Sequence, residues 1–172
     1  MKLSARLKVV FEHLLPQKDV WDICCDHGYL GMTAYQQQNF PNVYFVDQVS
    51  TIIEHLRVQF SKHTYRTPSN TAAHFICESA ENISTVVNGT VCIAGVGGLV
   101  IFKILQGLSR RGFMNADRLI LGPHRDEEKL MELIKSSAML SRYHLINRVE
   151  VIENNRARSI FIFDKLTSNS NS

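Results

Sequence analysis

Acidic side chains and glycines follow three apolar segments of the sequence. Asp22 and the turn Asp26-His27-Gly28 come at the end of the first apolar segment, and Asp47 follows the second, about 20 residues beyond the turn. The third segment runs into Ala94-Gly95-Val96-Gly97-Gly98. A glycine turn at a helix start presents backbone N–H groups to a ligand, and an acidic side chain at this spacing accepts hydrogen bonds from ribose hydroxyls. These residues predict a nucleoside site, and the absence of a G-x-G-x-x-G motif argues against a dinucleotide.

Each of these signals also has a purely structural interpretation. Asp47 is equally suited to cap the next helix, and Gly97-Gly98 to let a helix pack closely against the sheet. Asp26 fits a helix cap, and His27 fits an ordinary loop residue. The three signals together favour a site, because they fall at the ends of successive predicted strands.

The pattern of apolar residues places these loops at one edge of a sheet. Strands are expected over 20–25, 43–46, 73–77, 90–94 and 118–121, and helices over 3–14, 29–38, 50–63, 99–108 and 126–137. Two further strand-like runs, 143–152 and 158–163, are separated by a turn with Asn154-Asn155 and predict a hairpin. The predicted fold class is therefore α/β and Rossmann-like, a mostly parallel sheet closed by an antiparallel C-terminal hairpin. Ligands bind at the carboxyl ends of the strands in such sheets.

Composition indicates a folded protein with one core. The 172 residues are 45% hydrophobic and 20% charged, with a net charge of +3 that is compatible with a polyanionic partner. We expect one domain over residues 1–165 and a disordered Ser/Asn-rich tail over 166–172. The four cysteines lack metal-ligand spacing, so reduced, buried thiols and no metal are expected. No segment has the length of a membrane span or the form of a signal peptide, so a cytoplasmic protein with no membrane partner is expected.

Three segments carry a resemblance to a known family. Leu3-Ser4-Ala5-Arg6-Leu7 is similar to L-S-x-R-L, and Asp22-Ile23 with Asp26-His27-Gly28-Tyr29-Leu30 is similar to D-I-G-S-D-H-[AG]-Y-L. Ile93-Ala94-Gly95-Val96-Gly97-Gly98 is similar to I-A-G-M-G-G. In this order the segments resemble the bacterial tRNA adenine-22 N1-methyltransferases from Leu3 to about Lys165. The resemblance stops before that family's C-terminal coiled-coil domain, so we expect that the core alone holds RNA or that the substrate has changed.

The resemblance implies S-adenosylmethionine as cofactor and tRNA as partner. It implies that Asp22, Asp26, His27 and Gly28 surround the methionine end of the cofactor, that Asp47 takes the ribose, that Ala94 and Gly95 line the methyl-transfer side, and that Arg6 contacts the pocket or RNA. Three segments depart from the family. Cys24-Cys25 replaces Gly-Ser, Glu78-Ser79-Ala80 replaces a Gly-Asp-Gly that contacts the adenine, and Gly122-Pro123-His124 replaces a Gln-Pro-Asn expected near the acceptor base. Cys24, Glu78 and Ser79 are accordingly expected at the cofactor.

The expected reaction needs no strong base, because adenine N1 carries a free lone pair. Asp26 is the predicted catalytic residue, since a carboxylate stabilises the cationic ring that forms; its alternative role is to hold the cofactor's ammonium group. Tyr29 either stacks on an unpaired base or packs against the sheet. The alternatives are a methyltransferase with another substrate and a binding module without catalysis. The sequence does not predict the oligomeric state.

Overall fold

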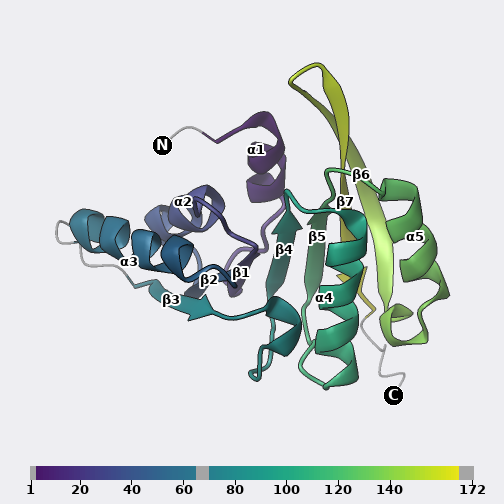
Figure 1. Cartoon of the computed structure of the whole chain (residues 1–172), viewed down its shortest axis with the longest axis horizontal. Helices are drawn as coiled ribbons and strands as arrows, with labels where there is room; N and C mark the ends of the chain where they lie inside the picture. The colour runs from purple at the N-terminus through teal and green to yellow at the C-terminus, as the bar shows by residue number, and fades with distance from the viewer. Residues whose placement is uncertain (1–2, 65–69, 167–172) are drawn as a thin grey trace.

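The computed structural model describes residues 3–64 and 70–166, which form one seven-stranded sheet covered by helices (Figure 1). The strands are β1 Val20–Ile23, β2 Asn42–Asp47, β3 Ala72–Cys77, β4 Thr90–Ala94, β5 Arg118–Gly122, β6 Tyr143–Glu153 and β7 Arg156–Lys165. The helices are α1 Ala5–Glu12, α2 Tyr29–Gln37, α3 Ser50–Thr64, α4 Gly98–Arg110 and α5 Glu127–Ser136, with short 3₁₀ helices η1 Ala80–Asn82 and η2 Ala138–Leu140. Apart from Leu166, the predicted tail lies outside the described residues.

The sheet has the strand order β3-β2-β1-β4-β5-β7-β6. Strands β1 to β5 pair in parallel, while β7 is antiparallel to both β5 and β6. This confirms the predicted α/β class and its C-terminal hairpin. The chain order reverses between β1 and β4, so the crevice above these two strands is the place where an α/β sheet binds ligands.

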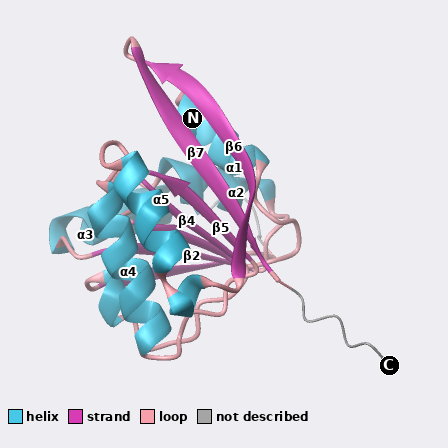
Figure 2. Ribbon diagram, turned by 90° about the vertical axis from the view of Figure 1, so that its right-hand side faces the viewer, coloured by secondary structure: helices cyan, strands magenta, loops and turns pink. Residues whose placement is uncertain are grey.

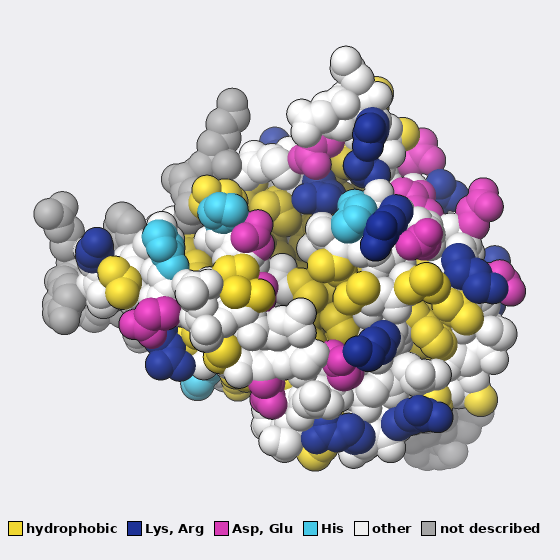
Figure 3. Space-filling model, in the orientation of Figure 1, with side chains coloured by type: hydrophobic (Ala, Val, Ile, Leu, Met, Phe, Trp, Pro, Cys, Tyr) yellow, Lys and Arg dark blue, Asp and Glu magenta, His cyan; other side chains and the backbone are white. Residues whose placement is uncertain are grey.

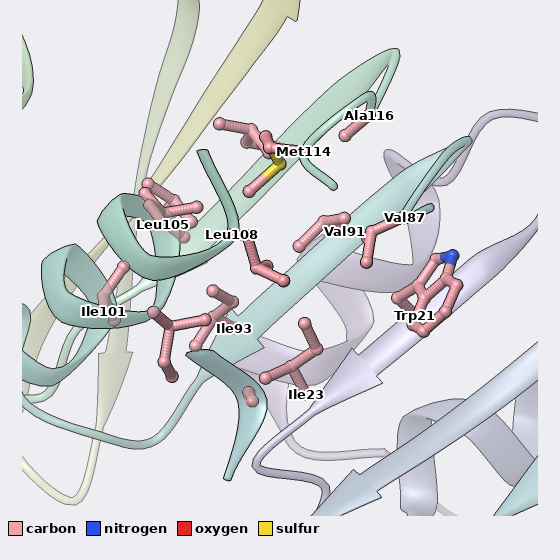
Figure 4. Packing of buried hydrophobic residues seen from close by; sticks show 14 of the residues in the cluster. Trp21, Ile23, Val87, Val91, Ile93, Ile101, Leu105, Leu108, Met114 and Ala116 are labelled. Atoms are coloured by element: carbon pink, nitrogen blue, oxygen red, sulfur yellow. The ribbon is translucent and has the colours of Figure 1, made fainter. Parts of the chain in front are cut away.

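Two apolar clusters hold helices on opposite faces of the sheet. Trp21 and Ile23 of β1 pack with α4 residues such as Ile101 and Leu105 on one face (Figure 4). On the other face, Phe45 of β2 packs in a cluster that includes residues of α1, α2 and α3. Figure 2 shows α4 and α5 side by side over their face of the sheet. Successive side chains of each strand point to opposite faces, and helices cover both faces. This arrangement is typical of parallel sheets.

The hairpin of β6 and β7 extends past the rest of the sheet (Figures 1 and 2). Its turn residues Asn154 and Asn155 have φ values of 50° and 57°. Two successive left-handed residues are typical of the tight turns that suit the twist of a hairpin, and asparagine tolerates this conformation. The hairpin packs against α1, so its end reaches the N-terminal helix.

The cysteines differ from expectation at two positions. Cys25 and Cys92 are buried, but Cys24 is half-buried and Cys77 is exposed. The prediction of four buried thiols was therefore wrong. Cys77 is exposed because it is the last residue of β3, which lies at the edge of the sheet.

Gly98 allows α4 to approach the start of α5. A methyl group at Gly98 would lie 2.5 Å from the carbonyl oxygen of Asp126. The N–H of Gly98 donates to the carbonyl of Arg125 at 2.9 Å. Gly98 thus allows close packing, but against the start of α5 and not against the sheet, so the predicted partner of this packing was wrong. Gly97 differs, because a methyl group there would meet the side chain of Arg125 at 3.0 Å.

Gly98→Ala should lower the free energy of unfolding by about 1–3 kcal/mol, because the added methyl group pushes the backbone of α4 away from the backbone at Asp126. Urea unfolding of the variant measures this loss. Gly97→Ala is the matched control and should cost less, since the Arg125 side chain is largely exposed and can move. Equal stability of Gly98→Ala and the unaltered protein would contradict the packing described.

Candidate functional site

A cavity of about 810 Å³ opens at the carboxyl ends of β1, β2 and β4. Figure 3 shows the molecule hollowed near the middle of this face, with acidic, basic and histidine side chains around the hollow. The predicted site residues that line the cavity are Arg6, Asp22, Cys24, Asp26, His27, Asp47, Glu78, Ser79, Ala94 and Gly95. Gly28 does not line it. The structure therefore brings ten of the eleven predicted residues together around one space.

The turn after β1 follows an unusual backbone path. Cys24, Asp26 and Gly28 all have positive φ, at 58°, 47° and 64°. Gly28 lies behind the wall of the cavity, where a methyl group would meet Leu56 Cδ2 at 2.6 Å. Gly28 thus lets α2 begin close to α3, and it supports the site without lining it.

Asp47 joins the turns that follow β1 and β2. Its two carboxylate oxygens accept the N–H groups of Asp26 at 3.3 Å and of Val49 at 3.0 Å. Val49 directly precedes α3, so Asp47 supports the start of that helix and also lines the cavity. The structural and functional interpretations of Asp47 are compatible, because each oxygen keeps a lone pair for a further donor.

Asp22 is a buried carboxylate in the floor of the cavity. One of its oxygens accepts the N–H of Gly31 in α2 at 3.0 Å. Burial raises the pKa of Asp22 to about 7, the charge of Asp47 adds to the rise, and the Gly31 hydrogen bond opposes it. A cationic ligand at this carboxylate would favour its charged form.

Asp26 and Tyr29 both face the cavity rather than the helix or the sheet. The N-cap of α2 is Gly28 and no side chain caps it, so the helix-cap interpretation of Asp26 was wrong. Asp26 Oδ2 lies 2.8 Å from His27 Nδ1, and the His27 ring stacks on Tyr29 with centroids 5.4 Å apart. Tyr29 is 43% exposed and lines the cavity, which contradicts its packing against the sheet.

A polar chain that joins the predicted Ser79 to two residues that sequence reasoning missed forms another wall. The Ser79 hydroxyl donates to Glu81 Oε2 at 2.7 Å, and Lys103 Nζ lies 2.8 Å from Glu81 Oε1. The Lys103 hydrogen bond is the main cause that lowers the pKa of Glu81, and Ser79 adds to it. Glu81 and Lys103 line the cavity from η1 and α4, and no motif joins two residues so far apart in the chain.

Arg6 meets Glu153 from the end of β6 above the cavity. Arg6 Nε lies 3.8 Å from Glu153 Oε2, and both side chains are mostly buried. Arg6 Nε is itself buried, with no hydrogen-bond partner in the described part of the chain. Gly95 adopts a φ of 85°, a conformation that favours glycine, and its backbone lies close to Arg6, because an added methyl group would be in ordinary contact with Arg6 Nη2 at 3.8 Å. Glu153 was also missed, since only the fold brings the hairpin to α1.

Acidic groups outnumber basic groups around the cavity. The carboxylates that line it belong to Asp22, Asp26, Asp47, Glu78, Glu81 and Glu153, and the permanent cations are Arg6 and Lys103. Such a field attracts a cationic ligand and repels a polyphosphate. In residues 3–64 and 70–166, no three metal-binding side chains gather into a metal site. No helix in these ranges has the length and apolarity needed to cross a bilayer.

The fold and the site together define a Rossmann-like domain whose cleft is lined by more acidic than basic side chains. A family model described as "Methyltransferase domain" matches residues 3–161, and the chain belongs to this family.

Several solved structures share the fold. The B. subtilis M1A22 tRNA methyltransferase TrmK superposes with a TM-score of 0.79 at 22% identity, over 96% of this chain and 67% of that chain. M. capricolum TrmK, solved with S-adenosyl-homocysteine, superposes with a TM-score of 0.76 at 16% identity, over 96% of this chain and 70% of that chain. The magnesium protoporphyrin IX methyltransferase of Synechocystis superposes with a TM-score of 0.68 at 11% identity, over 93% of this chain and 82% of that chain. No curated protein matches by sequence.

The buried carboxylate of Asp22 should make the stability of the free protein depend on pH. Its pKa is raised from 3.8 to about 7 on folding, so the folded state binds more protons between these values. The free energy of unfolding must therefore fall as pH rises through this window, by about 4 kcal/mol at most.

Asp22→Asn removes this charge, so the variant should gain stability relative to the unaltered protein between pH 5 and pH 8. Urea unfolding of both proteins at the two pH values measures the gain, and their difference removes the other titrating groups. A stability difference that does not change with pH would show that Asp22 is already ionised at pH 5.

Proposed function

We propose that this chain transfers the methyl group of S-adenosylmethionine to N1 of an adenine in tRNA. The observation that carries the proposal is the convergence of Asp22, Asp26 and Asp47 with the Gly95 turn around one acidic cavity. Membership of the methyltransferase family and the fold shared with two TrmK proteins support it.

The hydrogen-bond acceptors of the cavity fit S-adenosylmethionine. The cofactor carries a sulfonium and an ammonium, which suit the excess of carboxylates, and Asp22 keeps one oxygen without a recorded partner in the described chain. Asp47 retains lone pairs on both oxygens for the two ribose hydroxyls. When bound, the cofactor supplies a methyl group made electrophilic by its positive sulfur. The residues expected to hold it are Asp22, Cys24 and His27 at the amino-acid end, Asp47 at the ribose, Glu78 and Ser79 at the adenine, and Ala94 and Gly95 beside the methyl group.

The protein's contribution to this reaction is positioning and charge. Adenine N1 has a lone pair at neutral pH, so no residue needs to remove a proton, and alignment of the two reactants supplies much of the rate. The ring becomes cationic as the bond forms. Asp26 is the candidate to stabilise that charge, because its carboxylate lines the cavity and is accessible to an incoming base.

The His27 and Tyr29 ring pair offers a surface for the acceptor base. N1 lies on the pairing edge of adenine, so the base must be unpaired before it reacts. The exposed face of Tyr29 can stack on such a base, and its contact with His27 keeps the ring in place.

Incubation of the protein with labelled S-adenosylmethionine and bulk tRNA tests the proposal. We expect label in tRNA and 1-methyladenosine in the nucleoside digest by mass spectrometry. Label in another nucleoside or another molecule would establish a methyltransferase with a different acceptor. RNA binding without any methyl transfer would favour a binding module.

Asp47→Ala should weaken binding of S-adenosyl-homocysteine about ten- to a hundredfold, because hydrogen bonds to charged groups are worth about 1.5–3 kcal/mol. Titration calorimetry gives the dissociation constant directly. Asp117→Ala is the matched control, because this aspartate precedes the amino end of β5, whereas the cavity lies at the carboxyl ends of the strands. Unchanged affinity of Asp47→Ala would remove this carboxylate from the ribose site.

Asp26→Asn separates the two roles of that carboxylate. If Asp26 stabilises the cationic base, the single-turnover rate at saturating cofactor should fall about tenfold or more, with cofactor affinity nearly unchanged. If Asp26 holds the ammonium group, affinity should fall and saturating cofactor should restore most of the rate. Wild-type values of both quantities would exclude both roles.

A further inference from the structure

His124 lies in the loop after β5, beside the residues that line the cavity. The last residue pair of β4 and β5 is Ala94 with Gly122, and the two segments stay hydrogen-bonded beyond it. The Gly95 N–H donates to the Gly122 carbonyl and the His124 N–H donates to the Val96 carbonyl, both at 3.0 Å. Arg158 of β7 donates to the His124 carbonyl. The backbone of His124 is therefore held by the loop after β4 and by β7. His124 does not itself line the cavity, but it lies next to Gly95 and Val96, which do.

The hydrogen bond of the His124 ring fixes its tautomer. His124 Nδ1 lies 2.8 Å from the carbonyl oxygen of Gly95. A carbonyl oxygen only accepts, so Nδ1 carries the proton, and Nε2 of the neutral ring presents a lone pair. No partner of Nε2 is recorded in the described residues. The ring thus offers one oriented acceptor beside the turn where the methyl group is expected.

We infer that His124 Nε2 accepts a hydrogen bond from the exocyclic amino group of the acceptor base and so selects adenine. This inference rests on the proposed function. Adenine presents an amino donor next to N1, whereas guanine presents a carbonyl oxygen there, which the lone pair of Nε2 repels. One hydrogen bond would both orient N1 toward the methyl group and discriminate between the two purines.

The same hydrogen bond favours the transition state over the ground state. As N1 gains the methyl group, the positive charge spreads to the amino nitrogen, and a charged donor forms a stronger hydrogen bond than a neutral one. An interaction that strengthens during the reaction raises the rate of the chemical step. His124 and Asp26 would then act on the same charge from different loops.

A base without the amino group tests this contact. The probes are two tRNAs ligated from synthetic halves, one with adenosine and one with purine riboside at position 22; purine keeps the N1 lone pair and lacks the amine. Single-turnover rates are measured for the unaltered protein, His124→Leu and His124→Asn. We compare the effect of each substitution on the two tRNAs, because this ratio cancels the lower intrinsic reactivity of purine.

His124→Leu should slow methylation of the adenosine tRNA about tenfold or more and that of the purine tRNA less than about twofold. His124→Asn keeps an acceptor oxygen and should recover part of the rate on adenosine. Where purine reacts too slowly, the affinities of both tRNAs for the protein saturated with S-adenosyl-homocysteine replace the rates. His144→Leu, an exposed histidine on β6, is the matched control and should change neither rate.

Equal loss on the two tRNAs, or no loss on adenosine, would overturn the role of His124 and leave the proposed function standing. Failure of the unaltered protein to methylate the adenosine tRNA, while it binds S-adenosyl-homocysteine, would instead remove adenine as the acceptor and this inference with it. Binding of S-adenosyl-homocysteine by every variant shows that each one folds.

Discussion

The carboxylate of Asp22, buried where the strand order reverses, is the interaction on which the site depends. It accepts a hydrogen bond from Gly31 and so fixes α2 above the end of β1, and Asp47 lies near enough to raise its pKa further. Removing a carboxylate from water costs free energy unless donors or cations surround it. A single backbone N–H is a partial compensation. A bound cation would complete it, so this carboxylate suits the cleft to a positively charged ligand better than to a phosphate.

Elements distant in sequence close the space around this carboxylate. The Asp47 side chain joins the first two turns, η1 and α4 supply the Ser79, Glu81 and Lys103 chain, and the hairpin brings Glu153 to Arg6. Gly95, which adopts a positive φ, places its backbone beside the Arg6 guanidinium. The ends of the parallel strands therefore form the floor of the site, while α1 and the hairpin supply Arg6 and Glu153 to its upper wall.

Sequence reasoning predicted the elements well and the side-chain contacts only in part. Apolar runs and turn residues located every strand and each α-helix to within a few residues, because burial on both sheet faces imposes that pattern. Glu81 and Glu153 were missed, since their roles depend on pairing across the fold. Asp26 was also interpreted as a helix cap, because the sequence does not show that Gly28 is the N-cap residue of α2. The acceptor lone pair of His124 has no sequence signal at all, since a carbonyl from another loop creates it.

The most direct test of this account is the number of protons released when S-adenosyl-homocysteine binds. Calorimetry at pH 6 in buffers of different ionisation enthalpy gives that number, and the pKa of about 7 means that Asp22 is mostly protonated before binding. If the ligand's ammonium group pairs with Asp22, about one proton should leave per protein, and Asp22→Asn should abolish the release. Binding with no proton release from the unaltered protein, or the same release from the variant, would contradict the account.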